Sequence, residues 1–281
     1  MDLRRYSLDD AALTEARATL GYQPFRVTET VVTGVGYSWL HGVTPEALYQ
    51  PQLSFDRDRD PPETWDRAVA ANHRLARSYD RFLDAMAAAC PGGSFLDVSC
   101  NSGYFPVGAS LRGMRPAIGI DCLAYNRQVD LLNRATGAQA IFLYGEYRPP
   151  EHRLALPSGL SSKFDVVSNS AFLCHVPDPL SLLKALADIA AHALFIWAPI
   201  LRSDDLLIRY HGMNRFFDLP FPWGFDDATA ISDALLILSM TQLGFPNHVE
   251  LEPTPDAWPA EWDNPMMKPY QPLRAFLFRR A

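Results

Sequence analysis

Short apolar runs alternate with longer amphipathic stretches through the middle of the chain, and this alternation limits the possible folds more than any other sequence feature. The runs that we expect to form buried strands are Ser94–Ser99, Ala117–Ile120, Ala138–Tyr144, Phe164–Ser168 and Ala193–Ala198. Helical patterns separate them, with one helix ending near Leu111 and others over Asn126–Thr136 and Pro179–Ala190. Strands that alternate with helices predict a parallel sheet covered on both faces.

The end of the chain departs from this simple alternation. We expect a long helix over Asp226–Leu243, a strand over Asn247–Leu251 and a final strand over Pro272–Arg279. The stretch between the two strands is rich in Pro and Trp and is too long for a tight hairpin turn. The whole pattern predicts an α/β fold: a Rossmann-like, doubly wound, mostly parallel sheet of seven strands, with one antiparallel edge strand and helices on both faces.

The first sixty residues form a stretch of different character. A short helix is expected over Leu8–Leu20 and an extended segment over Phe25–Val35, and a charged, proline-rich linker follows. From Pro62 onward, apolar residues recur at helical spacing until Pro91-Gly92-Gly93. We therefore divide the chain into an N-terminal arm, residues 1–61, and a main domain, residues 62–281, in which residues 199–225 form an insertion.

Composition limits the classes of partner. The formal net charge of −7 argues weakly against a large nucleic-acid partner, because phosphate binding depends on clustered Lys and Arg. No pair among the four cysteines has the C-x-x-C spacing of a zinc site, so we expect no metal and four buried, reduced thiols. The sequence shows neither a signal peptide nor a membrane-spanning apolar stretch, and we expect a cytoplasmic protein.

The most informative stretch is F-L-D-V-S-C-N-S-G-Y-F, residues 95–105, where a strand passes into a helix. Ligands of open α/β sheets bind at this carboxyl edge. The next strand ends in Asp121, where a carboxylate is placed to accept the hydroxyls of a ribose. The pair of strand ends predicts a nucleoside ligand.

The turn after the first of these strands contains a single glycine, Gly103. A dinucleotide fingerprint needs several glycines so that the backbone can approach a pyrophosphate. Asn101 can adopt a left-handed conformation at low cost, so the turn can still be tight. A nucleoside ligand without phosphates, such as S-adenosylmethionine, fits this turn better than NAD.

The stretch L-D-V-S-C-N-S-G-Y-F resembles motif I of class I methyltransferases, and Ile118–Asp121 resembles their second motif. Residues 164–183, F-D-V-V-S-N-S-A-F-L-C-H-V-P-D-P-L-S-L-L, resemble their fourth-strand motif. The resemblance covers about residues 82–245 and is closest to a group that includes tRNA wobble-uridine modification methyltransferases and bacterial relatives. Ser99 stands where the family usually has Gly, and Asn101 where many members have a second Gly.

The resemblance implies S-adenosylmethionine as the cofactor. Asp97 and the turn up to Gly103 would hold its methionine end, Asp121 its ribose, and Cys122 and Leu123 its adenine. The full set of implied cofactor-binding residues is Asp97, Ser99, Cys100, Asn101, Gly103, Tyr104, Phe105, Asp121, Cys122, Leu123, Glu146, Asn169 and Ser170. Two of them have an alternative interpretation, since Asp97 can be a structural carboxylate and Glu146 a solvated loop acid.

Methyl transfer needs a general base only where the acceptor must lose a proton. His175, near the end of the fourth strand, is the first candidate, and His211 is the second. Within the insertion, charged, polar and aromatic side chains are suited to an acceptor, and the predicted substrate-binding residues are Arg202, Tyr210, Asn214, Arg215 and Trp223. The alternative is a lid whose aromatic residues fold onto the core.

The sequence leaves three functional hypotheses. The first is methyl transfer from S-adenosylmethionine to a small-molecule or glycan acceptor by direct displacement, which the acidic charge favours. The second is a tRNA-modifying methyltransferase, and the third is a non-catalytic S-adenosylmethionine-binding scaffold subunit. An NAD-dependent dehydrogenase is disfavoured by the lack of a phosphate-binding turn.

Overall fold

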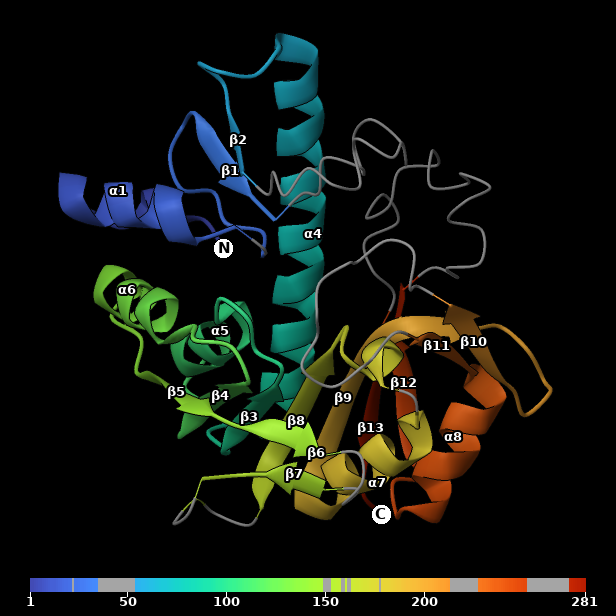
Figure 1. Cartoon of the computed structure of the whole chain (residues 1–281). Helices are drawn as coiled ribbons and strands as arrows, with labels where there is room; N and C mark the ends of the chain where they lie inside the picture. The colour runs from blue at the N-terminus through green and yellow to red at the C-terminus, as the bar shows by residue number, and fades with distance from the viewer. Residues whose placement is uncertain are drawn as a thin grey trace.

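A sheet of nine strands forms the centre of the molecule in this computed structural model (Figure 1). Seven of the strands run in the order β10-β11-β9-β8-β3-β4-β5, and β13 and β12 extend the sheet from β9 along a second branch. The structure describes residues 1–21, 23–34, 54–148, 153–157, 160, 163–176, 178–212, 227–251 and 273–281.

Five parallel strands make up the part of the sheet that the sequence predicted. They are β3 (Phe95–Val98), β4 (Ala117–Asp121), β5 (Ala140–Tyr144), β8 (Phe164–Ser170) and β9 (Ala190–Leu201). In register, Asp97 of β3 lies between Gly119 of β4 and Ser168 of β8. The carboxyl ends of these three strands therefore meet at one edge of the sheet.

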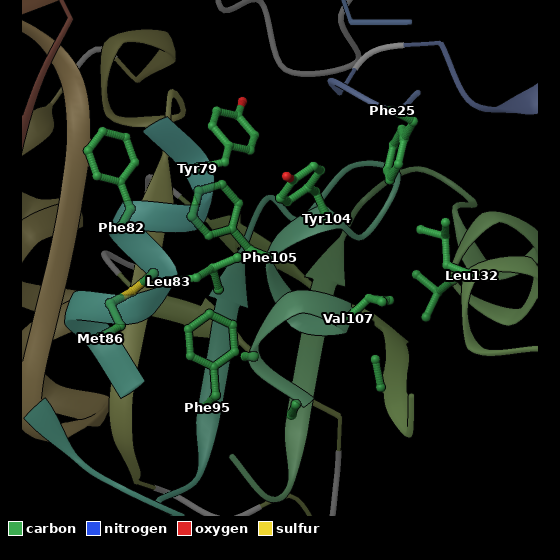
Figure 2. Packing of buried hydrophobic residues seen from close by; sticks show 14 of the residues in the cluster. Phe25, Tyr79, Phe82, Leu83, Met86, Phe95, Tyr104, Phe105, Val107 and Leu132 are labelled. Carbon is green, nitrogen blue, oxygen red and sulfur yellow. The ribbon is translucent and has the colours of Figure 1, made fainter. Parts of the chain in front are cut away.

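Helices cover both faces of the sheet, as the alternation predicted. They are α1 (Asp10–Thr19), α4 (Pro62–Ala89), α5 (Tyr104–Leu111), α6 (Asn126–Thr136), α7 (Pro179–Ile189) and α8 (Asp233–Gln242). Figure 2 shows Phe82 of α4, Phe105 of α5 and Phe95 of β3 in one buried hydrophobic cluster. A second cluster of buried hydrophobic residues lies on the opposite face of the sheet and includes Leu183 of α7 and Leu236 of α8.

The antiparallel strand expected at the end of the chain, β13 (Leu273–Arg279), lies one position in from the edge instead of at the edge. It pairs antiparallel with both β9 and β12 (Asn247–Leu251), and β12 forms the edge. Residues 274–278 are all buried, whereas the first three residues of β12 are exposed. A strand that is apolar on both faces is stabilised most by an inner position.

Two further strands lie where the sequence predicted a loop and the start of a long helix. β10 (Ile208–Gly212) pairs antiparallel with β11 (Asp227–Ser232), which continues the sheet from the end of β9. The following helix begins only at Asp233, because Ser232 caps it by accepting the N–H of Leu235 at 3.2 Å. The sheet consequently has nine strands instead of seven.

The N-terminal segment packs onto the main domain and shares its hydrophobic core. It contains η1 (Leu3–Arg5), α1 and the antiparallel pair β1 (Val31–Thr33) and β2 (Ser54–Asp56). Phe25 belongs to the same buried cluster as Phe82, Phe95 and Phe105. In Figure 1 this segment lies beside α4 and above α5 and α6.

The cysteines and the helix lengths test two further expectations. All four cysteines are free, but only Cys100 is buried and Cys122 is exposed, so the expectation of four buried thiols was wrong. Cys122 is exposed because it lies just beyond β4, in the loop before α6. Among the described helices, none is both long enough and apolar enough to cross a bilayer.

Candidate active site

Asp97 is a buried carboxylic acid within β3, one residue before the carboxyl end of the strand, and its side chain is only 1% exposed. Among the described residues, none forms a hydrogen bond with either of its carboxylate oxygens. Burial, with a smaller contribution from the charge of Asp121, raises the pKa of Asp97 to about 8. The Ser168 hydroxyl offsets part of this effect without reaching hydrogen-bond geometry. The carboxylate is therefore suited to an external hydrogen-bond donor or cation.

The neighbouring strand β8 adds two more buried polar atoms. Ser168 Oγ and Asn169 Oδ1 also have no hydrogen-bond partner within the described part of the chain, although Asn169 Nδ2 donates to the carbonyl of Val98 at 3.4 Å. Side chains alternate along a strand, so Asp97 and its register partner Ser168 share the face covered by α4 and α5, and Asn169 points to the other face. Buried polar atoms without a partner are rare, and their concentration at one edge indicates a ligand site.

The turn between β3 and α5 is tight and contains three residues in the left-handed region. Ser99, Asn101 and Gly103 have φ angles of 68°, 50° and 89°. The left-handed conformation predicted for Asn101 is confirmed, and Ser99 adopts one that costs free energy for a residue other than glycine. At Gly103 a Cβ atom would lie 2.6 Å from Val129 Cγ2, so only glycine fits there.

Asp121 ends β4 and connects the next strand to this turn. Its carboxylate accepts the backbone N–H of Asn101 and of Leu123, each at 3.0 Å. Burial raises the pKa of Asp121, and these hydrogen bonds lower it in part. Because Gly119 is the register partner of Asp97, Asp121 lies on the same face two residues further along. The sequence prediction that both acids lie close together at one edge is confirmed.

Three of the predicted cofactor-binding residues have side chains directed into the protein. A Cβ on Gly119 would lie 2.6 Å from the Sγ of Cys100, so the thiol packs beneath the turn. Tyr104 and Phe105 are fully buried, with ring centroids 5.0 and 4.8 Å from that of Tyr79 (Figure 2). These three residues can therefore meet a ligand only through their backbone.

The residues after β4 and β5 form the next part of this edge. Cys122 and Leu123 are exposed, and the 56% exposure of Leu123 leaves an apolar side chain beside Asp121 for a planar base. Tyr144, the register partner of Asp121, is 59% exposed at the end of β5. The sequence reasoning missed Tyr144, although an aromatic residue ending an apolar strand at the ligand edge was an available signal. Glu146 begins β6 (Glu146–Arg148), and the structure describes only its backbone.

The end of β8 continues into a second strained turn. Ser170 is half-buried, and Ala171 has a φ of 59° and donates its N–H to the carbonyl of Trp197 at 2.7 Å. His175 lies in the short helix η3 (Leu173–His175) and is exposed. The Thr229 hydroxyl of β11 lies within donating distance of the carbonyls of Leu173, the first residue of η3, and of Val176, the residue after it, at 3.3 and 3.1 Å. The candidate base thus lies at the same edge of the sheet, in a segment held to β11.

Most of the predicted substrate-binding residues cannot be located as side chains. Arg202 is exposed, and its guanidinium lies 3.9 Å from the Glu250 carboxylate. Only the backbone of Tyr210 and His211 is described, within β10. The predicted residues outside the described part of the chain are Asn214, Arg215 and Trp223. The role of residues 199–225 in acceptor binding therefore stays a prediction.

A cavity of about 540 Å³ lies at the opposite edge of the sheet. Its lining includes Cys90, Asp165 and His192, and His192 Nε2 lies 3.4 Å from Asp165 Oδ1. These residues lie near the amino ends of β3, β8 and β9, whereas Asp97 and Asp121 lie near the carboxyl ends. This cavity is consequently separate from the candidate site.

Comparison with protein families identifies one match. A family model described as a methyltransferase domain matches residues 71–218, which is more than half of the chain. The matched range contains Asp97, Asp121 and Ser168, and it begins after the N-terminal segment. None of the curated proteins matches this chain.

Several solved structures have a similar fold. The N-terminal domain of EvdMO1, crystallised in the presence of SAH and D-fucose, is 16% identical, with 73% of this chain and 84% of that chain covered and a TM-score of 0.49. Magnesium protoporphyrin IX methyltransferase from Synechocystis PCC 6803, with bound SAH, is 15% identical over 76% of this chain and 87% of its own, with a TM-score of 0.49. The YcgJ protein from Bacillus subtilis is 13% identical over 73% and 98%, with a TM-score of 0.48.

Proposed function

The chain belongs to the methyltransferase family whose domain model matches residues 71–218, and we propose that it transfers a methyl group from S-adenosylmethionine to a small-molecule or sugar acceptor. One observation carries the proposal. Asp97 and Asp121 lie on neighbouring parallel strands, on the same face and at the carboxyl edge, and the buried Asp97 carboxylate has no partner among the described residues.

The residues at this edge fit the cofactor. S-adenosylmethionine, when bound, supplies a methyl group on a positively charged sulfonium. In the proposal, Asp97 and the backbone of the turn up to Gly103 hold the cationic methionine end. Asp121 retains lone pairs beyond its two backbone hydrogen bonds, and these accept the ribose hydroxyls. The exposed Leu123 packs against the adenine.

The reaction places few chemical demands on the protein. A sulfonium is already a good leaving group, so the main tasks are to align donor and acceptor at roughly 3–3.5 Å and to exclude water. His175 is proposed to take up a proton from acceptors that must lose one, with His211 of β10 as the second candidate. Asn169 and Ser170, at the end of β8, lie under the sulfonium in the proposal.

Charge favours a small acceptor over a nucleic acid. The chain has a net charge of −7. No Lys or Arg stands at the last residue of β3, β4, β5 or β8, or at the two positions after each of these strands. A polyanion would meet Asp97 and Asp121 at this edge without compensating cations. We therefore place a small or sugar acceptor opposite the cofactor, with residues 199–225 facing it.

Two measurements test the proposal. Titration calorimetry with the purified chain should give heat with S-adenosylmethionine and none with NAD. Transfer of a radiolabelled methyl group is then followed in cell extract that has been separated into small-molecule, glycan, protein and RNA fractions. Label in the small-molecule or glycan fraction supports the proposal.

The other outcomes each contradict a part of it. Label in tRNA, with steeply salt-dependent retention of that RNA, would identify an RNA-modifying enzyme. Tight cofactor binding without transfer to any fraction would indicate a scaffold subunit. Absence of cofactor binding would remove the proposed role of Asp97 and Asp121.

A further inference from the structure

Gln23 is a buried glutamine of the N-terminal segment, and its side chain reaches the turn between β3 and α5. Its Nε2 donates to the carbonyl oxygen of Cys100 at 3.3 Å, and the backbone N–H of Tyr104 donates to its Oε1 at 2.9 Å. The side chain is only 5% exposed, so both hydrogen bonds are shielded from water. Gln23 lies outside the range 71–218 that the family model matches.

The backbone around Gln23 is itself held in place. The carbonyl of Gln23 accepts the Thr33 hydroxyl at 2.7 Å. Asn72, a buried residue of α4, donates to the carbonyls of Phe25 and Thr33 at 3.1 and 2.7 Å. Gly34 lets the two chain segments approach closely, because a Cβ there would lie 2.3 Å from the backbone of Gln23. Gln23 is consequently fixed relative to α4 and not only to its own segment.

The two hydrogen bonds of Gln23 bracket the strained turn. Tyr104 is the first residue of α5, so its N–H has no acceptor within the helix. An N-cap side chain accepts the N–H of the second or third helical residue, so Gln23 supplies the acceptor for this first one from a distant segment. At the other end Gln23 binds Cys100, directly before the left-handed Asn101. Strained backbone persists only where its surroundings hold it.

We propose that Gln23 is a positioning residue that holds this turn in the conformation that binds the cofactor. The N-terminal segment is then part of the S-adenosylmethionine site. This inference rests on the proposed function, because it takes the turn as the part of the protein that meets the methionine end. Gln23 acts through the backbone of Cys100 and Tyr104, so its loss reduces cofactor affinity and loosens the turn.

The test replaces Gln23 by Met, a side chain of similar length that can make neither hydrogen bond. We expect Gln23→Met to weaken S-adenosylmethionine binding at least tenfold in titration calorimetry. Hydrogen exchange of the Tyr104 amide in the cofactor-free protein should become at least tenfold faster. The matched control is Gln242→Met at the exposed end of α8, which should leave both quantities within twofold of the parent.

A second variant makes the result independent of folding defects. Gln23→Glu keeps an acceptor for the Tyr104 N–H, but it replaces the amide donor that faces the Cys100 carbonyl by a carboxyl oxygen and places a buried acid there. We expect binding three- to tenfold weaker and slow Tyr104 exchange. If a folded Gln23→Met protein binds the cofactor within twofold of the parent, or if Gln23→Glu is as weak as Gln23→Met, the inference is overturned. Failure of the parent itself to bind S-adenosylmethionine would instead contradict the proposed function.

Discussion

Asp97 of β3 and Ser168 of β8 are register partners on neighbouring parallel strands, and all three of their side-chain oxygens are buried without a hydrogen-bond partner among the described residues. An unpartnered buried acid destabilises the fold, because the charged form loses its hydration. A fold can retain such a group where a bound ligand supplies the hydrogen bonds or the opposite charge that the group has lost. This relationship leads to two predictions that separate stability from binding.

The first prediction concerns Asp97→Asn, which removes the charge and nearly preserves the shape. The pKa of Asp97 is about 8 in the folded protein and near 3.8 in the unfolded chain, so the folded state binds an extra proton between these values. Stability of the parent therefore falls as pH rises from 4 to 8. We expect Asp97→Asn to raise the free energy of unfolding by up to about 5 kcal/mol at pH 8 and hardly at all at pH 4. Urea denaturation at both pH values measures this difference.

The same variant should bind S-adenosylmethionine at least tenfold more weakly, although it is more stable. Asp130→Asn, an exposed position on α6, serves as the control and should change neither quantity. Lower stability at pH 8 would show that Asp97 is a structural carboxylate with partners in solution.

The second prediction concerns the pH dependence of cofactor affinity in the parent protein. Below pH 8 the Asp97 carboxyl is mostly protonated, and binding of a cationic ligand favours its ionised form. One proton is then released on binding, so affinity should rise up to about tenfold per pH unit between pH 6 and 8 and level off above. Calorimetry in buffers of different ionisation enthalpy measures both the affinity and the released proton. In Asp97→Asn the slope should disappear, and a flat profile in the parent would contradict the assignment.

The third prediction concerns recognition of the ribose by Asp121. Hydrogen bonds to a charged group contribute about 1.5–3 kcal/mol each, so Asp121→Ala should weaken S-adenosylmethionine binding by about 10- to 100-fold. Asp121 also accepts two backbone N–H groups, and its removal loosens the turn as well. The 2′-deoxy analogue of the cofactor separates the two effects. The parent should bind the analogue more weakly than the cofactor, and Asp121→Ala should bind both equally.

Sequence patterns predicted those parts of the site that depend on neighbouring strands. Consecutive parallel strands bring their carboxyl ends together, so the closeness of Asp97 and Asp121 follows from the order of strands and helices. Helix α6 also has the bounds that the sequence predicted, Asn126–Thr136, because its amphipathic pattern is local. Local patterns were therefore sufficient to predict the position of the sheet edge and of its two acids, Asp97 and Asp121.

Contacts between distant segments could not be predicted in this way. Gln23 and Cys100 are 77 residues apart, and nothing in the spacing of the sequence links them. The segment Asp227–Ser232 reads as the start of a helix, but pairing with β10 and with the end of β9 makes it a strand. Tyr104 and Phe105 follow the cofactor turn directly, yet their rings fill the core because α5 packs against α4. In each case tertiary packing, and not the local sequence pattern, determines which segments are in contact.

The fourth prediction concerns the strain at Ser99, whose φ of 68° is unfavourable for a residue with a Cβ atom. Glycine adopts this conformation without steric cost but loses more freedom on folding, so the two effects partly offset each other. We expect Ser99→Gly to raise the free energy of unfolding by about 0.5–1 kcal/mol and to bind S-adenosylmethionine at least as tightly as the parent, because the turn gains space for the ligand. Ser7→Gly, at an exposed position that is not among the positive-φ residues, should instead lower stability by about 0.5–1 kcal/mol. Urea denaturation and calorimetry measure both effects, and a destabilised Ser99→Gly protein would show that the serine side chain supports the turn.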